Sequence, residues 1–452
     1  MKQRADRARK PAERRSSLFE SVLLFLCLGV LALRATYTEG PTVQTLTLPG
    51  GLTDAVYSLT LSGILGLTLL LWFVRQLWQG RVTYRVSGLE IGLILFLLAA
   101  VISAFGASDK RLAINHVVML VGPLLAAILL VQILTRGSRV WAALLVIGAL
   151  GVVSTYQCAE QFLVSNKILI EQYARDPEML LRPLGIEPGS FQHFLFEHRL
   201  YGRGIRGFFT TSNSAASFSM LAFFAAAALL LRRGPSSAGD KPRPHSRWYP
   251  IVAAGVILAG LLLTQSKGGI LAFFTAAVAL AVLVVARKQI MAHRRTVWIV
   301  STGAVLLVSL AAGYTVVSYG LQHGRLPGGN SMLVRWQYWH ASAKMCADHA
   351  VTGVGPGNFG QYYTHYKPAS APESVSDPHS FPLSLLTQFG PLGLLGFLLL
   401  AAIPIYRQSL PTPDPPGLAD DPERDRRLVF GMLLSICATL LMIRVFAWCG
   451  IS

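Results

Sequence analysis

The polar segment from about Tyr319 to Ser380 carries most of the side chains in the second half of the chain that could do chemistry. His379 stands near its end, directly after Pro378 and just before a long apolar run. An imidazole is close to neutral at working pH and can take a proton from a hydroxyl. The alternative is an ordinary histidine at a membrane surface. The other candidates are Arg325, Arg335, Lys344, His340, His349, His365, Trp336, Trp339, Tyr338, Tyr362, Tyr363 and Tyr366.

A basic segment earlier in the chain, residues 199–220, reads RLYGRGIRGFFTTSNSAASFSM. Three arginines, Arg203 and Arg206 among them, lead into a helix start that Ser212 or Asn213 is expected to cap. Arginines near a helix N-terminus make a strong oxyanion site, because the guanidinium groups and the helix dipole act together. Taken alone, the segment is better explained as a capped helix whose arginines bind lipid headgroups.

A shorter basic turn, TQSKGGIL at residues 264–271, places Lys267 before two glycines and between two apolar runs. A glycine pair lets the backbone approach an anion closely. The turn lacks the GxxxxGK[ST] order of a P-loop, so nucleotide binding is not expected. A tight turn without a ligand explains the pattern about as well.

Residues 331–363 contain two further patterns. The spacing over 331–348 predicts a helix, and GVGPGNF at 353–359 predicts a turn-rich lid or loop. Trp336 and Trp339 fit an interfacial aromatic belt better than a platform for sugars. The histidines have no metal-ligand spacing, so no metal site is expected.

The composition is that of a membrane protein. The chain is 53% hydrophobic and only 14% charged, whereas soluble domains carry about 25% charged residues. Apolar runs near the ~20 residues needed to cross a bilayer recur along the chain. The predicted fold is therefore an all-α polytopic membrane protein. About eleven spans are expected, at 18–34, 57–78, 89–107, 113–134, 139–164, 212–231, 249–265, 268–286, 297–319, 379–406 and 428–447.

The expected organisation follows from these spans. A basic arm, 1–17, precedes the first nine spans at 18–319, which include an outer segment at 165–211. A large outer loop, 320–378, separates them from the last two spans at 379–452. The first apolar run lacks a cleavage site and is expected to be a retained anchor. The five cysteines suggest no disulfide framework. Two Pro-rich linkers are expected at 232–248 and 407–427.

The positive charge sets the expected orientation. With the N-terminus in the cytoplasm, 25 of the 40 lysines and arginines fall in cytoplasmic segments, in agreement with the positive-inside rule. The net charge of +18 is then explained by topology and by contact with anionic membrane lipids rather than nucleic acid. This orientation puts the residues of greatest interest on one outer face. They are Arg203, Arg206, Lys267, Arg335 and His379.

Taken in order, these segments resemble the O-antigen ligase family of membrane glycosyltransferases, which also contains O-antigen polymerases and bacterial protein O-glycosylating enzymes. The resemblance covers about residues 199–397 and is most specific in the outer loop. Two departures stand out: Lys267 where the family usually has arginine, and Ser380 where asparagine is usual. The matching pieces are Arg203-Gly204-Ile205-Arg206-Gly207 through Asn213, Gln265 to Gly269, Arg335-Trp336, Gly353 to Phe359, and His379.

The resemblance implies a GT-C-like architecture and a reaction without metal or other cofactor. A glycan would pass from a polyprenyl-pyrophosphate carrier to the hydroxyl of a glycan, lipid-linked or protein acceptor, on the periplasmic face of the bacterial inner membrane. His379 would be the base, and inversion at the anomeric carbon would follow from a single displacement. Arg203, Arg206 and Lys267 would bind the pyrophosphate, and Arg335 would order the outer loop or add to the anion site.

Three alternative functions are also compatible with the sequence. A polymerase that joins carrier-linked glycans would use the same residues. A transporter of the lipid-linked sugar is less well supported, because the spans show few buried charges and no matching broken helices. A membrane protein without catalysis, whose basic loops only hold headgroups, is the third alternative.

Overall fold

The computed structural model describes residues 2–37, 51–80, 82–202, 204–230, 248–327, 330–371 and 374–409, and every regular element in these ranges is a helix. The predicted all-α fold is confirmed for this part of the chain. Arg203, most of the two Pro-rich linkers and the expected span at 428–447 lie outside the described residues.

The described helices include nine that are long and apolar enough to cross a membrane, which makes the chain a polytopic membrane protein. A tenth apolar helix, α10 (Trp248–Leu263), is shorter. The positions agree with the expected spans to within a few residues, apart from one long helix described below. The nine are Leu18–Thr36, Asp54–Trp78, Leu89–Gly106, Lys110–Ile133, Gly137–Arg175, Ser212–Leu230, Lys267–Val285, Arg295–His323 and Phe381–Arg407.

The chain forms two compact units. The first contains Met1–Arg85 and Val118–Ile270, and the second contains Val86–Val117 and Leu271–Ser452. Two helices, α4 (Lys110–Ile133) and α11 (Lys267–Val285), begin in one unit and end in the other.

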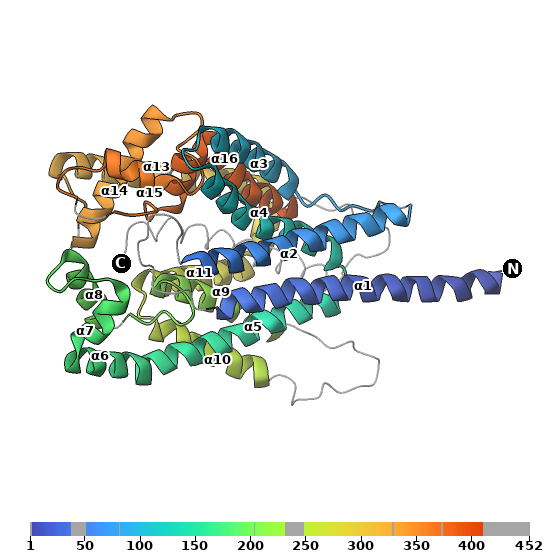
Figure 1. The fold of residues 1–452 in the computed structure, drawn as a ribbon. Helices are drawn as coiled ribbons and strands as arrows, with labels where there is room; N and C mark the ends of the chain where they lie inside the picture. Colours follow the sequence, from blue (N-terminus) through green and yellow to red (C-terminus); the bar gives the residue numbers. More distant parts are fainter. Residues whose placement is uncertain are drawn as a thin grey trace. The chain divides into compact units, whose positions relative to one another are not determined.

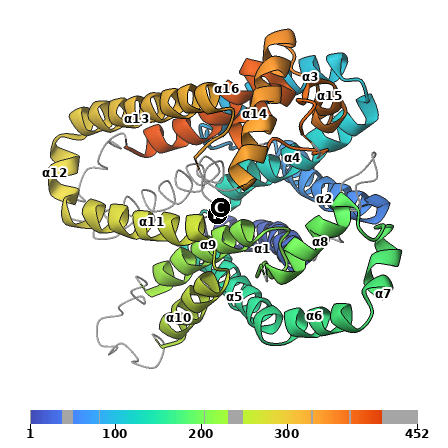
Figure 2. The same ribbon diagram turned by 90° about the vertical axis from the view of Figure 1, so that its left-hand side faces the viewer.

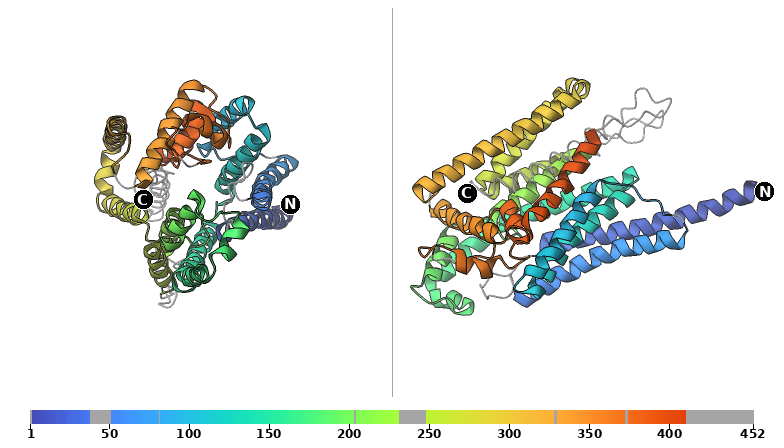
Figure 3. Two further views of the ribbon diagram at one scale, coloured as in Figure 1. Left: turned by 60° about the vertical axis from the view of Figure 1, so that its left-hand side comes forward. Right: turned by 90° about the horizontal axis from the view of Figure 1, so that it is seen from above.

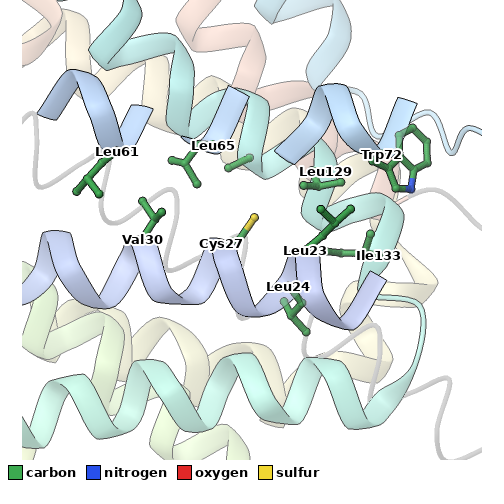
Figure 4. Close-up of a cluster of buried hydrophobic side chains, with 10 residues drawn as sticks. Leu23, Leu24, Cys27, Val30, Leu61, Leu65, Trp72, Leu129 and Ile133 are labelled. Carbon is green, nitrogen blue, oxygen red and sulfur yellow. The ribbon is translucent and has the colours of Figure 1, made fainter. Parts of the chain in front are cut away.

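The first unit contains a cluster of buried apolar side chains between α1 (Lys2–Thr36), α2 (Gly51–Trp78) and the later part of α4. Figure 4 shows Leu23 and Cys27 of α1 with Leu65 of α2 and Leu129 of α4 in this cluster. Helices α1 and α2 run side by side (Figure 3). Lipid tails are as apolar as these side chains, so tight packing holds the helices together.

Small residues bring α5 (Gly137–Glu160), α9 (Ser212–Leu230) and α10 together in the same unit (Figure 2). A Cβ atom added at Gly151 of α5 would lie 2.4 Å from the Cβ of Ala222 in α9. One added at Gly260 of α10 would lie 2.1 Å from Oγ1 of Thr155 in α5. Only glycine allows these backbones to approach so closely.

Helix α5 continues through a π-helical turn, Gln161–Ser165, into α6 (Asn166–Arg175). The apolar helix from Gly137 to Arg175 has 39 residues, which is about 58 Å at 1.5 Å per residue against a hydrocarbon core of about 30 Å. Its far end packs with α7 (Pro177–Leu181), the 3₁₀ turn Arg182–Leu184 and α8 (Phe191–Tyr201). The predicted segment 165–211 is therefore largely helical.

In the second unit, α3 (Leu89–Gly106) lies against α16 (Phe381–Ser409), as Figures 1 and 2 both show. A Cβ at Gly92 would lie 2.5 Å from the backbone nitrogen of Leu400, and one at Gly396 would lie 2.6 Å from that of Phe96. The Phe96 ring lies 5.0 Å from the ring of Phe389. These contacts fix the depth and rotation of α16 relative to α3.

The second unit also contains α12 (Arg287–Ala292), α13 (Arg294–His323), α14 (Asn330–Asp348) and α15 (Phe359–Tyr366). The predicted helix at 331–348 is thus confirmed as α14. Its residues Tyr338 and Met345 pack with Phe359 and Tyr363 of α15. Trp336 lies against Gly320 of α13. These side chains of α14 form a protein core.

Replacing Gly396 by valine should destabilise the protein, because the new side chain would meet the backbone of Phe96. Overpacking of this kind costs about 1–3 kcal/mol or more. We expect a lower midpoint of thermal unfolding in detergent. The matched control is Gly303→Val in α13, where no atom lies within 4 Å of the added Cβ. Equal midpoints for the two variants would contradict the close approach of α3 and α16.

Candidate functional site

The backbone at His379 is in an uncommon conformation. Its φ is 54°, in the left-handed region that residues other than glycine seldom occupy. Its N–H donates a hydrogen bond of 2.8 Å to Oδ1 of Asp377, which closes a local turn of the type that aspartate favours. His379 is exposed and stands two residues before α16 begins.

Helix α14 forms one wall of the turn around His379. Trp339 donates from Nε1 to the carbonyl oxygen of Pro378 at 3.2 Å. The ring of Tyr338 lies 5.6 Å from the imidazole of His379. Arg335 is three and four residues before these two aromatics and so shares their helix face. The second unit therefore places the α14 face that carries Arg335 beside the segment that carries His379.

The glycine-rich segment at 353–359 is a closely packed loop, which confirms the predicted turns and disfavours a lid. Gly353, Gly355 and Gly357 have φ values of 64°, 94° and 72°. A Cβ at Gly355 would lie 2.5 Å from that of Ala107. The N–H of Gly357 donates to Oε1 of Gln388 at 2.6 Å.

Asn358 fixes this loop to the turn between α3 and α4. Its Oδ1 accepts from the Ser108 hydroxyl at 2.9 Å and from the N–H of Asp109 at 2.8 Å. Its Nδ2 donates to the carbonyl oxygens of Asp109 at 3.2 Å and Pro356 at 2.9 Å. The side chain is fully buried, so its four hydrogen bonds are part of the framework rather than a ligand site.

The other histidines of the segment have separate surroundings. His340 lies near Trp336, and His349 meets the ring of Tyr362 edge-on at 5.2 Å. His365 is exposed on α15. Within the described ranges, no group of three His, Cys, Asp or Glu side chains is placed to hold a metal ion.

Arg206 belongs to the first unit, where a glutamine holds its backbone. Gln161, the first residue of the π-helical turn, accepts at Oε1 from the N–H groups of Arg206 and Gly207, at 3.1 and 3.0 Å. Its Nε2 donates to the carbonyl oxygen of Gly207 at 3.0 Å. Gly207 is buried with a φ of 56°. The backbone is thus held in place while the side chain of Arg206 stays exposed.

The starts of α9 and α11 are joined by a hydrogen bond. Thr211 caps α9, since its Oγ1 accepts from the N–H of Ser214 at 3.1 Å, so the predicted cap at Ser212 or Asn213 is wrong. Asn213 instead accepts from the Ser266 hydroxyl. Ser266 caps α11 by accepting from the N–H of Gly269 at 3.0 Å. The cap thus lies one residue before Ser212 and two before Asn213, and the side-chain oxygen of Asn213 bonds instead to Ser266, 53 residues later in the chain.

The first unit therefore brings together the two segments that carry Arg206 and Lys267. Lys267 is the first residue of α11 and is exposed. Two helix N-termini lie next to each other there, and each carries a partial positive charge from its dipole. Lys267 is exposed at one of these N-termini, and Arg206 is exposed six residues before the other, so this region is suited to an anion. Arg203 lies outside the described residues.

Backbone strain coincides with the candidate residues. Within the described ranges, the non-glycine residues with positive φ are Gln265, at 53°, and His379, at 54°. One stands two residues before Lys267, and the other is the proposed base. Such strain persists only where its surroundings hold it, and it clusters at functional sites.

Residue types alone did not reveal Gln161, Asp377 and Gln388 as the side chains that hold these segments. An Asp-Pro pair directly before His379 is a turn motif in the sequence, and it could have identified Asp377. The contacts of Gln161 and Gln388 join residues 46 and 31 positions apart. No local pattern predicts them.

Replacing Asn358 by alanine should loosen the glycine-rich loop. The part-buried N–H of Asp109 would lose its partner, and leaving such a group unpaired costs up to roughly 1–3 kcal/mol. We expect a lower thermal unfolding midpoint. Thr364→Ala is the control, because its exposed hydroxyl bonds within α15. An unchanged midpoint in Asn358→Ala would show that the loop does not depend on this side chain.

Comparison with known proteins gives one family. Residues 251–398 match the sequence profile described as O-antigen ligase. No curated protein matches the chain. The matched stretch includes Lys267, Arg335, the glycine-rich loop and His379. The other piece of the sequence resemblance, from Arg203 through Asn213, lies before it. Residues 251–398 thus carry an O-antigen ligase domain, which supports a membrane glycosyltransferase of the O-antigen ligase type.

Proposed function

We propose that the protein transfers a glycan from a polyprenyl-pyrophosphate carrier to an acceptor hydroxyl, as an O-antigen ligase. The observation that carries this proposal is the state of His379 inside the matched domain. Its backbone is strained and hydrogen-bonded, while the residue is exposed and its ring lies beside Tyr338. A proton acceptor held in this way suits a reaction that must deprotonate a hydroxyl.

The proposed reaction is a single displacement. The acceptor hydroxyl gives its proton to His379 as its oxygen bonds to the anomeric carbon. The bond from that carbon to the pyrophosphate oxygen breaks, and the carrier pyrophosphate leaves with the bonding electrons. Attack opposite the leaving group inverts the anomeric centre. The chemistry proposed here assigns no role to a metal ion.

The cations are proposed to act on the leaving group. Pyrophosphate gains negative charge as the anomeric bond breaks, and fixed cations stabilise that change. Arg206 and Lys267 would supply them, together with Arg203. We assign Arg335 to ordering the outer segment, because it shares a helix face with Tyr338 and Trp339, which contact the His379 turn.

The proposed location is the inner membrane of a bacterium, with the N-terminus in the cytoplasm and the active face in the periplasm. The distribution of lysine and arginine supports this orientation. The acceptor can be a glycan, a lipid-linked sugar or a protein. A polymerase of lipid-linked repeat units would use the same groups, so it remains the second candidate.

Replacing His379 by alanine should abolish transfer and leave carrier binding intact. Loss of a general base lowers rates by about 10²–10⁴-fold. The measurement is product formation by purified protein with a labelled carrier-linked glycan and candidate acceptors in detergent. The matched control is His365→Ala on α15, which should stay active. Full transfer by the His379 variant would remove it as the base.

The same assay separates the alternatives. Product on a distinct acceptor indicates a ligase, and joined carrier-linked glycans indicate a polymerase. In liposomes, movement of the label across the membrane without any covalent product would indicate a transporter and would refute the proposed function.

Replacing Arg206 or Lys267 by alanine should weaken binding of the carrier-linked donor. Hydrogen bonds to charged groups contribute about 1.5–3 kcal/mol, so we expect a fall of about tenfold to a hundredfold in kcat/KM. Lys267→Arg should retain activity, because a guanidinium also binds phosphate. Lys167→Ala, an exposed cation on α6, is the control. A donor affinity unchanged in both alanine variants would contradict the anion site.

A further inference from the structure

We propose that Asp377 is a positioning residue for His379 and ends a chain of hydrogen bonds that begins at the glycine-rich loop. This inference rests on the proposed role of His379 as the base. It assigns Asp377 no part in the chemistry itself. Its function would be to keep the backbone of His379 in the conformation that presents the imidazole.

Both carboxylate oxygens of Asp377 accept hydrogen bonds from the protein. Oδ1 accepts from the N–H of His379 at 2.8 Å, and Oδ2 accepts from the hydroxyl of Ser384 at 2.6 Å. Asp377 is half-buried. A carboxylate engaged at both oxygens is suited to hold its donors in place, and less suited to exchange a proton with a substrate.

The chain continues along α16 to the glycine-rich loop. The hydroxyl of Ser384 accepts from Nε2 of Gln388 at 2.7 Å, one helical turn later. Oε1 of Gln388 then accepts from the N–H of Gly357 at 2.6 Å. Each donor in this chain points toward Asp377, so all of its hydrogen bonds run in the same direction. Ser384 and Gln388 are both buried, and water has little access to compete for these bonds.

A histidine of α4 lies beside this chain of hydrogen bonds. His116 lies against Gly357, where an added Cβ would come within 3.4 Å of the His116 Cβ. It also interacts electrostatically with Asp377. Asp377 thus interacts with His116 of α4 and is linked through Ser384 and Gln388 of α16 to the glycine-rich loop.

The strained backbone explains why such support is needed. A histidine at φ 54° has a higher energy than one in extended or right-handed conformation. Without its bond to Asp377, the N–H of His379 would lose the contact that favours this conformation. The turn would relax, and the imidazole would move away from where the fold presents it. A displacement of about 1 Å can lower a rate a hundredfold.

The test compares three substitutions at one position. The amide introduced by Asp377→Asn keeps an oxygen that can accept from the N–H of His379, so this variant should stay within about threefold of wild-type kcat. Asp377→Ala removes the acceptor, and kcat should fall by at least about tenfold with little change in the KM for donor. Asp377→Glu keeps the charge but lengthens the side chain, so the turn should not close and kcat should fall likewise.

The outcomes separate positioning from chemistry. An Asp377→Asn variant as slow as Asp377→Ala, with Asp377→Glu active, would show that the charge matters and would overturn the proposal. Wild-type kcat in Asp377→Ala would overturn it as well. If Asp377→Ala does not fold, the Asn and Glu pair gives the same decision.

Two further variants serve as controls for this test. Asp348 accepts from the Tyr366 hydroxyl at 2.8 Å in the same outer segment, and Asp348→Asn should leave kcat unchanged. Activity retained in His379→Ala would refute the proposed base. An inactive His379→Ala beside a fully active Asp377→Ala would refute positioning alone.

Discussion

The close approach of α3 and α16 is the constraint on which the second unit depends. Glycines on both helices bring one backbone against the other, at distances that no side chain allows. In lipid, where apolar side chains gain nothing by leaving their surroundings, such packing takes over the role that hydrophobic burial has in water. Helix α16 is thereby fixed, and with it Ser384 and Gln388, whose hydrogen bonds reach back to the residues before the helix.

The two units use the same device in different places. In each, a polar side chain fixes the local backbone beside an exposed ionisable one: Gln161 holds the segment of Arg206, and Asp377 holds that of His379. The holding groups are satisfied by the protein, and the two candidate residues, Arg206 and His379, stay exposed. Tyr366 differs from Arg206 and His379, because a carboxylate of the protein holds its side-chain hydroxyl. Its hydroxyl donates to Asp348, which, together with burial, raises the pKa of the tyrosine, so this phenol remains a donor.

The sequence predicted the parts of the structure that depend on composition and local pattern. The apolar runs gave the spans, and helical spacing gave α14, because both depend only on neighbours along the chain.

The cap of α9 was misplaced by one or two residues, since several polar residues there can cap equally well. The length of the helix from Gly137 to Arg175 was missed because its last turns are polar and resemble a loop. The contacts of Gln161 and Gln388 could not be foreseen, because they join segments far apart in the chain. Backbone strain at His379 has no counterpart in the pattern of residue types.

The backbone strain at His379 affects which variants a selection for thermal stability would favour. Glycine adopts positive φ without penalty, so at position 379 it would remove a local conformational cost that histidine carries. A library ranked by heat resistance alone would tend to enrich for such a replacement and discard the imidazole. Under the proposed role of His379 as the base, ranking the same library by glycan transfer would do the opposite. With His379 as the proposed base, stability and catalysis would make opposing demands on this one position.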